Sequence, residues 1–334
     1  MGQDIYFTKA YAEVNALIEA GEAIFIELDN QYGHITHSAI KREIANEIDG
    51  VKYYDLITPY GYGGPIIHRC IDEARLIESY EVALHEYCEA NRIVSEFVRF
   101  HPLFQNQEAF KDIYDVKYLR QTVGTDLRRF DNTFQSEFST TARRRIRNLI
   151  KEEKYSCVLA KGFDDIEDFI SIYKETMDRR HATDFYYFNR NYFYELKRRF
   201  RSQLVTTTVY YQGEIIAMGL YFLSGKVVHD HLNGTKAEYL HLSPAYLLKY
   251  TMMNWASKNG FDVIHYGGGV SNAQDDSVLK FKKSFAKNTD FEFHIGSRIW
   301  NQSVYEVLCR NRDIDSTSGF FPAYRAPVEK IKER

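Results

Sequence analysis

The feature that most constrains the fold is a succession of three strand-like segments in the C-terminal part of the chain. They cover Leu204–Tyr211, Glu214–Leu223 and Lys226–Leu232. The dipeptides Gln212-Gly213 and Ser224-Gly225 that separate them are typical of two-residue hairpin turns. Such turns join antiparallel neighbours, whereas a parallel connection needs about a dozen residues or more. The sequence therefore predicts an antiparallel meander.

Helices and further strands flank this meander. From Lys154 onward the predicted order is strand, helix, helix, three strands, helix, strand, helix and strand, as expected of a mixed α/β half. Residues 1–60 begin a similar alternation, with a hairpin of Ala23–Leu28 and Gly33–His37. No flexible linker divides the chain. We therefore predict an α/β (α+β) fold of two mixed-sheet halves side by side, over residues 1–145 and 146–334, with a groove between them.

Composition argues against several classes of protein. The 334 residues carry a net charge of −3 with a pI of about 6.4, so a global basic field for nucleic acid is absent. The four cysteines are widely spaced and form no CxxC motif, which indicates reduced thiols and no zinc site. The N-terminal residues do not have the pattern of a signal peptide, and no apolar run is about 18 residues long. We expect a cytoplasmic protein without a membrane span or a metal site.

A glycine-rich turn is the first candidate site. Gly267, Gly268 and Gly269 follow a short apolar strand, and glycines let the backbone turn tightly or approach a ligand. Asp275, Asp276 and Ser277 are candidate N-caps of the next helix, which carries the segment Phe281–Phe285. Lysines and aromatic residues this close to a glycine turn indicate a site that holds a carbonyl or phosphate group. The alternative is a capped helix with solvated lysines.

A second candidate site lies in the N-terminal half. The segment Thr58–Pro65 contains two prolines, three glycines and two tyrosines, which predicts a rigid loop at a strand end. Tyr60 and Gly61 belong to this loop. Arg99 and His101 stand at the end of a strand predicted at residues 92–100. We interpret Arg99 as a bidentate clamp for an anionic substrate, with the tyrosine loop supplying contact area.

Together these motifs resemble the FemABX family, whose members are built from two halves similar to GNAT acyltransferases. The resemblance is carried by the Tyr60–Pro65 loop, the Arg144-Arg145-Ile146-Arg147 helix, the glycine-ended strand at His231, and the pair Phe281-Lys282 before Phe285. It covers residues 5–305 approximately. It implies that residues 1–145 form a GNAT-like, acceptor-binding half and residues 146–334 a GNAT-like, catalytic half.

The resemblance also implies a reaction. FemABX enzymes transfer amino acids from aminoacyl-tRNA to a peptidoglycan precursor, and other relatives resemble transferases that acylate amino sugars of surface polysaccharides. The implied function is amide formation, in which an aminoacyl or acyl group passes to an amine of a cell-wall or surface-polysaccharide precursor. The expected partners are a nucleotide- or lipid-linked sugar or peptide and a tRNA, with peripheral membrane contact where the precursor is lipid-linked.

The roles of individual residues follow from the same resemblance. In the family, the lysine of a Phe-Lys pair stabilises the tetrahedral oxyanion, and Lys282 has that position here. We expect His231 to orient or deprotonate the attacking amine, or else to be a hydrogen-bonded core histidine. The predicted catalytic residues are thus Lys282 and His231. The predicted substrate-binding residues are Tyr60, Gly61, Arg99, His101, Arg179, Asn233, Gly268 and Phe281.

The acyl donor is constrained by a missing motif. GNAT enzymes that use acyl-CoA wrap its pyrophosphate with a glycine-containing loop at a helix N-terminus, whereas the corresponding Lys236–Ala245 has no glycine. We therefore expect no tightly bound cofactor and no tight acetyl-CoA binding. The expected co-substrate is aminoacyl-tRNA or an acyl thioester, with acyl-CoA ranked lower. The coiled-coil hairpin that some members insert for tRNA is absent. The resemblance therefore implies the fold more firmly than it implies a tRNA donor.

Several alternatives stay open. The chain could be an ordinary acyl-CoA-dependent N-acetyltransferase, or a non-catalytic precursor-binding protein in which the Lys282 ammonium faces away from the cleft. A metal hydrolase would use His229, Asp230 and His231 but lacks a further ligand that can be named. A Rossmann domain is disfavoured because Gly267–Gly269 does not have GxGxxG spacing. The acyl group, the donor, the acceptor and the oligomeric state are not determined by the sequence.

Overall fold

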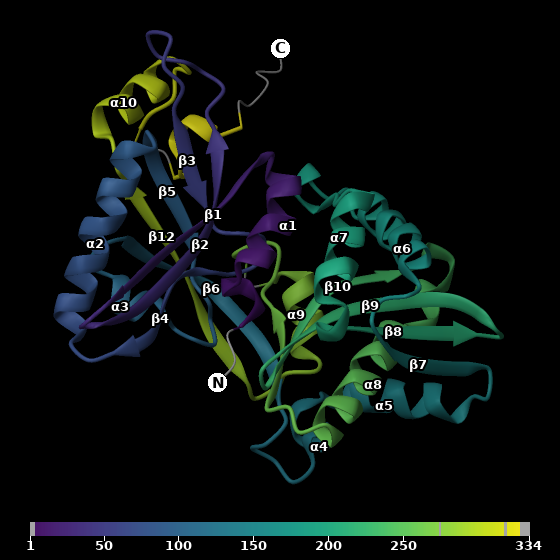
Figure 1. Ribbon diagram of the computed structural model, residues 1–334. Helices are drawn as coiled ribbons and strands as arrows, with labels where there is room; N and C mark the ends of the chain where they lie inside the picture. The colour runs from purple at the N-terminus through teal and green to yellow at the C-terminus, as the bar shows by residue number, and fades with distance from the viewer. Residues whose placement is uncertain (1–3, 274, 317–318, 328–334) are drawn as a thin grey trace, which may run out of the picture. The chain divides into compact units, whose positions relative to one another are not determined.

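The computed structural model describes residues 4–273, 275–316 and 319–327, which form two compact units. Among these described residues, one unit lies between residues 120 and 292 and includes residues 4 and 5; it is called the central unit because it holds the middle of the sequence. The other unit, called flanking because its segments lie on either side in the sequence, lies within residues 6–119 and 293–327. The chain passes between the units after Ile5, and again within strands β6 (Asp115–Asp126) and β12 (Asp290–Ile299), which are labelled in Figure 1.

These boundaries differ from the predicted division at residues 145 and 146. Residues 120–145 belong to the central unit, where β6 pairs in antiparallel orientation with β11 (Val263–Gly267). Residues after 292 belong to the flanking unit, because β12 returns to pair with β5 (Ile93–Arg99). A chain that returns to its first unit cannot be divided by one cut in sequence order. The assignment of acceptor binding and catalysis to separate halves stays a prediction.

The flanking unit contains a mixed sheet in the order β1-β2-β3-β5-β12, with β4 paired to β2. Strands β1 (Gly21–Asn30) and β2 (Gly33–Glu43) form the predicted antiparallel hairpin. Strand β3 (Tyr54–Ile57) runs parallel to β5. Strand β4 (Gly64–Cys70) begins with the last two residues of the tyrosine loop, so that loop connects β3 to β4.

Helices cover both faces of this sheet, because its strands direct alternate apolar side chains to opposite faces. Helix α2 (Glu73–Ala90) packs on the face that carries Ala39 and Leu56. Helix α1 (Lys9–Glu19) packs on Ile40 and Ile57 of the other face, and α10 (Gln302–Arg310) packs there beside Val94. The short helix α3 (Gln107–Phe110) follows β5 in the sequence.

The central unit contains a sheet in the order β6-β11-β10-β9-β8-β7. The predicted meander is confirmed: β8 (Leu204–Tyr211), β9 (Glu214–Ser224) and β10 (Val227–Thr235) pair in antiparallel orientation. Its first turn has Gln212 and Gly213 at φ of 52° and 86°, the left-handed conformation of a type I′ turn. Strand β7 (Tyr155–Lys161) pairs with β8 in antiparallel orientation, and β10 pairs with β11 in parallel.

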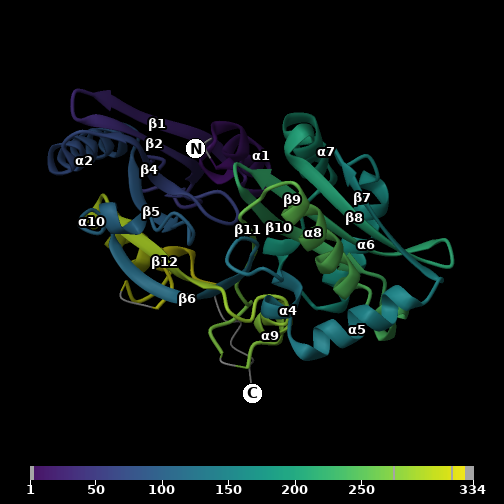
Figure 2. The ribbon, with the colours of Figure 1, turned by 90° about the horizontal axis from the view of Figure 1, so that it is seen from below.

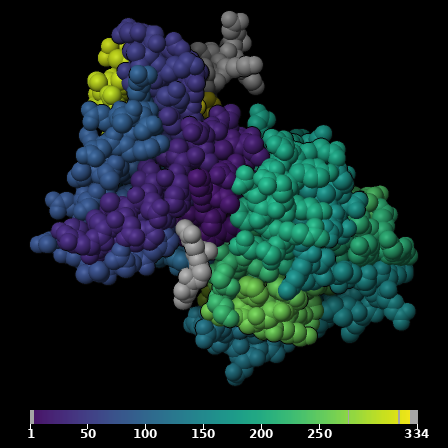
Figure 3. Space-filling view, in the orientation of Figure 1, coloured from purple at the N-terminus to yellow at the C-terminus, as the bar shows by residue number. Residues whose placement is uncertain are grey.

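Two groups of helices cover the faces of the central sheet. Helices α5 (Thr140–Lys151) and α8 (Ala245–Lys258) pack on one face, and α9 (Ser277–Lys283) adds Phe281 to the same core. Helices α6 (Ile166–Arg179) and α7 (Arg190–Phe200) pack around the aromatic cluster of Phe169 and Phe193. Figure 2 shows α5 and α7 on opposite sides of the strands, and Figure 3 shows α6 and α7 forming much of this unit's visible surface.

The remaining elements are short. Helix α4 (Thr133–Glu137) precedes α5, and 3-10 helices occur at Ile5–Phe7, Asp184–Tyr186, Arg201–Gln203, Ala237–Leu242 and Ala323–Arg325. Among the residues that the structure describes, no helix is long and apolar enough to cross a membrane. The order of α-helices and strands predicted from Lys154 onward is observed as far as β12, after which α10 is an additional helix. The mixed α/β class is confirmed.

Candidate active site

Strands β10 and β11 of the central sheet run parallel but stop pairing before either strand ends. Strands β10 and β11 pair only from Val227 to His229 and from Val263 to His265, although β10 continues to Thr235 and β11 to Gly267. The pairing of β10 with β9 is also irregular between Asp230 and Leu232. β-Bulges of this kind are common next to active sites, because they redirect side chains. The residues just after His229 and His265 are therefore placed to form a site.

The glycine turn after β11 is shaped by Asp276. The Asp276 carboxylate accepts hydrogen bonds from the backbone N–H groups of Val270, Ser271 and Leu279 at 2.8 to 3.0 Å, and the last of these caps α9. These hydrogen bonds lower the pKa of Asp276, although burial opposes them. A Cβ atom on Gly269 would lie 2.5 Å from an Asp276 carboxylate oxygen. The sequence prediction of a glycine turn capped by an aspartate is thus realised with Asp276 as the N-cap.

Lys282 is held at this turn by the packing of its neighbours. Phe281 and Phe285 pack edge-to-face against each other and against Tyr246 of α8. The Lys282 ammonium donates a hydrogen bond to the Gly268 carbonyl at 2.7 Å. Burial lowers the pKa of Lys282 to about 8, with Lys249 and Arg180 also lowering it and Asp230 and Asp276 raising it. Lys282 is therefore a partly buried, positioned ammonium group and not a solvated surface lysine.

A buried ion pair lies in the same part of the central unit. The Lys249 ammonium donates to the Asp230 carboxylate at 2.5 Å and to the Asn233 side-chain oxygen at 3.0 Å. The Asn233 amide donates in turn to the other Asp230 oxygen at 2.9 Å. The rings of Tyr221 and Tyr266 flank the ammonium, with centroids 5.5 and 5.6 Å away. Asn233 was predicted to bind substrate; its side chain here completes this polar cluster.

The ion pair was missed by the sequence analysis, although a signal for it exists. Lys249 lies in the apolar stripe of α8 with Met252, Met253 and Ala256, which is the i, i+3, i+4, i+7 spacing of a buried helix face. A lysine in such a stripe needs a buried partner. Asp230, in the middle of an apolar strand, is the complementary signal.

The histidines of β10 have separate environments. His231 is buried, lies 3.0 Å from the Tyr192 hydroxyl, and has its pKa lowered by burial to about 3. His229 lies 2.8 Å from Asp4, whereas Asp230 pairs with Lys249. This geometry favours the interpretation of His231 as a hydrogen-bonded core histidine. It gives no support to a shared metal site of these three residues.

The predicted acceptor residues of the flanking unit lie close together. The tyrosine loop runs beside the end of β5, where Gly63 donates its N–H to the Arg99 carbonyl at 2.8 Å. The Arg99 guanidinium donates to the Thr58 carbonyl at 3.1 Å and remains partly exposed, as does Tyr60. Gly61 has φ of 94°, and a Cβ there would lie 2.6 Å from the Tyr6 ring. His101 is fully buried among aromatic rings, so it is packed like a core residue.

The predicted basic residues of the central unit are mainly engaged within the protein. Arg179 donates to the Thr235 carbonyl at 2.9 Å and so holds the end of β10. On α5, Arg143 donates to the Phe138 carbonyl, Arg145 to the Ser243 hydroxyl, and Arg147 lies over the Phe134 ring. The arginine stripe of α5 therefore has structural contacts along much of its length.

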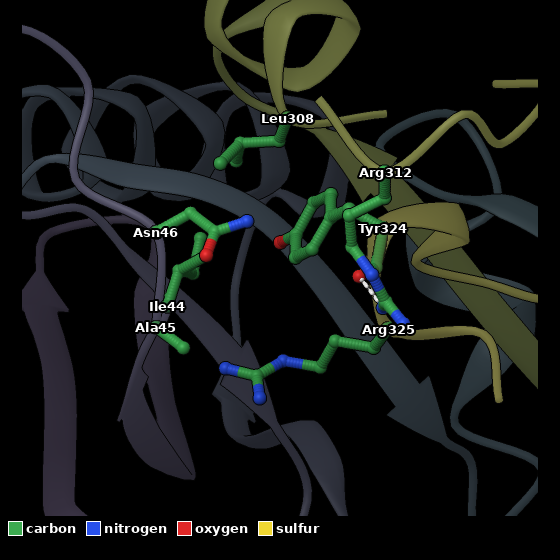
Figure 4. Close-up of a pocket in the computed structure, with 7 residues that line it drawn as sticks. All are labelled: Ile44, Ala45, Asn46, Leu308, Arg312, Tyr324 and Arg325. Atoms are coloured by element: carbon green, nitrogen blue, oxygen red, sulfur yellow. Dashed lines mark hydrogen bonds between the residues drawn. The ribbon is translucent and has the colours of Figure 1, made fainter. Parts of the chain in front are cut away.

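A pocket of about 300 Å³ lies in the flanking unit, beside the core cluster that contains Ile44, Leu308 and Tyr324. Figure 4 shows its lining by Ile44, Ala45, Asn46, Leu308, Arg312, Tyr324 and Arg325. Arg325 pairs with Asp55, and Arg312 donates to the Tyr324 carbonyl. Both guanidinium groups thus have partners within the unit.

Comparison with known proteins identifies the class. Residues 136–283 match the family model described as an acetyltransferase (GNAT) domain, and this range includes Asp230, Lys249 and Lys282. The match covers less than half of the chain and supports an acyltransferase that contains a GNAT-type domain. No curated protein matches it in sequence.

Solved structures identify the particular architecture. FemX is 13% identical with a TM-score of 0.67, covering 92% of this chain and 94% of its own. The C-terminal domain of a putative lysylphosphatidylglycerol synthetase from Agrobacterium fabrum is 12% identical with a TM-score of 0.55, covering 93% and 92%. L-PGS from Bacillus licheniformis is 12% identical with a TM-score of 0.53, covering 93% and 98%. The predicted FemABX-like fold of two GNAT-like halves is confirmed, while the branch is not specified.

Proposed function

We propose that this protein forms amide bonds by transferring an aminoacyl or acyl group to an amine of a cell-wall or surface-polysaccharide precursor. The observation that carries the proposal is the position of Lys282, whose ammonium is partly buried and fixed 2.7 Å from the Gly268 carbonyl within the GNAT-matched region. A fixed cation in a site that excludes water stabilises the oxyanion of acyl transfer more strongly than a solvated one. The fold similarity to FemX supports the precursor as acceptor.

The proposed reaction is a direct transfer. The acceptor nitrogen attacks the donor carbonyl carbon and forms the C–N bond, and Lys282 stabilises the resulting negative oxygen. Collapse breaks the C–O bond to a tRNA ribose, or the C–S bond of a thioester. The leaving oxygen or sulfur takes up the proton that the nitrogen loses. Cys88, Cys157 and Cys309 are disfavoured as nucleophiles, because burial raises the pKa of each of these thiols.

The test is a transfer assay with defined donors. Purified protein is given a nucleotide-linked peptidoglycan precursor with either tRNA charged with labelled amino acids or labelled acetyl-CoA, and products are identified by mass spectrometry. Lys282→Met should lower turnover roughly 100- to 1000-fold while leaving precursor binding nearly unchanged. Lys283→Met is the matched control, because Lys283 is exposed and next in sequence. Full activity of Lys282→Met, or loss in the control instead, would contradict the assigned role.

We propose aminoacyl-tRNA as the favoured donor and an acyl thioester as the second. The segment Lys236–Ala245 forms a 3-10 helix and a left-handed turn at Ser243 before α8, in place of a glycine-containing pyrophosphate loop. Calorimetry with acetyl-CoA should therefore show no tight binding. Micromolar affinity would favour an ordinary acyl-CoA-dependent N-acetyltransferase. Precursor binding without turnover from either donor would favour a non-catalytic binding protein.

The acceptor is proposed to be an anionic, nucleotide- or lipid-linked precursor held by the flanking unit. The tyrosine loop and Arg99 lie side by side there, and a guanidinium suits recognition of phosphate. Arg99→Ala should weaken precursor binding in calorimetry, whereas Arg75→Ala, an exposed arginine of α2, should not. Equal affinity of the Arg99 variant and the unmodified protein would remove Arg99 from the binding site.

A further inference from the structure

Arg120, in strand β6, is bonded to the same glycine turn as Lys282. Through Nη1 its guanidinium donates to the Gly269 carbonyl at 2.9 Å and to the Ser271 carbonyl at 3.3 Å. Lys282 donates to the carbonyl of Gly268, the preceding residue, at 2.7 Å. Backbone carbonyls that no helix or sheet ladder engages need partners of this kind. Two positively charged side chains therefore share the carbonyls of one short turn.

Gly268 leaves the space that the Arg120 side chain needs. A Cβ atom on Gly268 would lie 3.2 Å from Arg120 Cδ and 3.1 Å from the Gln121 carbonyl oxygen, which is tighter than an ordinary van der Waals contact. The stem of Arg120 therefore passes close to the backbone of Gly268 before its guanidinium reaches the carbonyl of Gly269. The sequence analysis predicted that Gly268 binds substrate; in the structure this glycine also gives Arg120 access to the turn.

Neither of these cations is paired with a carboxylate among the residues that the structure describes. There the Arg120 guanidinium donates only to the two carbonyls of the turn, and the Lys282 ammonium has the Gly268 carbonyl as its one hydrogen-bond partner. The Asp276 carboxylate accepts from backbone N–H groups of the turn instead. Because an ammonium carries three donors and Lys282 uses one, two remain free.

We propose that Arg120 is a positioning residue for Lys282. By occupying the carbonyls of Gly269 and Ser271, Arg120 leaves Gly268 as the acceptor for the ammonium and keeps the other donors of Lys282 free for a ligand. A guanidinium suits this role, because it stays charged and its planar N–H groups bind two acceptors at once. That the ligand is the oxyanion of acyl transfer rests on the proposed function. The control of Lys282 by Arg120 rests only on contacts within the central unit.

Removal of the guanidinium frees two carbonyls in the residues that follow Gly268. In Arg120→Met an apolar stem still packs beside Gly268, but Gly269 and Ser271 lose their donor. The flexible Lys282 ammonium should then bond to these carbonyls, because an unpaired backbone carbonyl is unfavourable. Its free donors are thereby used within the protein. Arg120→Lys keeps the charge and the ability to donate, so it should preserve most of the original arrangement.

The first experiment is NMR of the lysine ammonium groups in the full chain, labelled with ¹⁵N and ¹³C and free of substrate. The Lys282 signal is assigned by its absence in Lys282→Met. In the unmodified protein it should show scalar coupling through the hydrogen bond to the carbonyl carbon of Gly268. In Arg120→Met this coupling should be lost, and coupling to the carbonyl carbon of Gly269 or Ser271 should replace it. An unchanged pattern in Arg120→Met, or no coupling to Gly268 in the unmodified protein, would overturn the proposal.

The second experiment measures whether Arg120 acts through Lys282. Arg120→Met should lower kcat by up to roughly 100-fold with little change in the KM for the precursor, because a small displacement of a catalytic group has effects of this size. Arg120→Lys should recover most of the lost kcat. In the Lys282→Met background, Arg120→Met should cause no further loss, whereas a residue with a purely structural role would lower activity again. A further loss in the double variant would therefore contradict the proposal.

Arg128→Met is the matched control for both experiments. The Arg128 guanidinium is exposed and donates to the Asp262 carboxylate at 3.2 Å, so its removal should change neither the Lys282 signal nor kcat. If Arg120→Met does not fold, the uncharged and shorter Arg120→Gln takes its place and must show the same loss of coupling. The NMR experiment needs no substrate. An unmodified protein that transfers no acyl group would therefore refute the proposed function, while the coupling pattern would still test the role of Arg120.

Discussion

At the scale of single residues, Gly269 leaves little room for a side chain. A Cβ there would lie 2.5 Å from the Asp276 carboxylate, which cannot retreat without losing its hydrogen bonds to Val270, Ser271 and Leu279. Gly269→Ala should destabilise the protein by about 1–3 kcal/mol, the usual range for overpacking, and should lower transfer activity further by displacing the turn that holds Lys282. Thermal unfolding and the transfer assay measure the two effects. Gly319→Ala is the control, because nothing lies within 4 Å of its Cβ position, and an equal loss of stability there would contradict the steric argument.

At the scale of elements, α9 depends on its cap because it has only seven residues. Asp276→Ala removes the side chain that accepts from Leu279, and loss of an N-cap costs about 1 kcal/mol. Isolated helices of this length are unstable, so backbone hydrogen exchange over residues 270–283 should become roughly fivefold faster or more, and transfer should fall. Asp72→Ala removes the corresponding cap of the 18-residue α2 and should affect only its first turn. Unchanged exchange in α9 would show that Phe281 and Phe285 alone hold it.

At the scale of the whole molecule, stability should depend on pH through a buried pair in the flanking unit. Glu96 lies 3.2 Å from His37, and burial raises the pKa of Glu96 to about 7 and lowers that of His37 to about 3. A raised carboxyl pKa means that the folded state keeps a proton that the unfolded state loses, so this contribution is full below about pH 4.5 and is lost as pH rises to 7. His37 has the opposite effect on stability. Below pH 6.5 its imidazole binds a proton in the unfolded state but not in the folded state, so its contribution destabilises the fold as the pH falls.

Glu96→Gln isolates the carboxyl contribution. As the pH rises from 4.5 to 8, the unfolding free energy of this variant should increase by about 3 kcal/mol relative to that of the unmodified protein, since the variant has no charge to bury. Denaturant unfolding at several pH values measures this difference. Glu86→Gln, on the exposed side of α2, should show no such trend. A constant difference between Glu96→Gln and the unmodified protein across this range would mean that Glu96 is not protonated in the folded state.

The sequence by itself determined the local order of this protein. The turn at Gln212-Gly213 and the turn at Gly225-Lys226, which is one residue later than the predicted Ser224-Gly225, specified the meander. Gln212, Gly213 and Gly225 have the left-handed backbone conformation that such turns need. The spacing of Phe281 and Phe285 predicted that both rings pack into one core, although α9 ends at Lys283 and Phe285 follows it. The aspartate before that helix predicted its cap. Turn conformation, helix capping and helix periodicity depend on residues that are close together in the sequence, so the sequence alone determines them.

Only the tertiary structure decided the relations between distant segments. The return of β12 to β5 brought residues after 292 into the flanking unit, and this depends on strand pairing across about two hundred residues of sequence. The meeting of Asp230 with Lys249 likewise depends on α8 packing beneath β10, and the burial of His231 depends on Tyr192 from α7. Burial and the proximity of charges change the chemistry of a side chain, and both are properties of the folded surroundings and not of the local sequence.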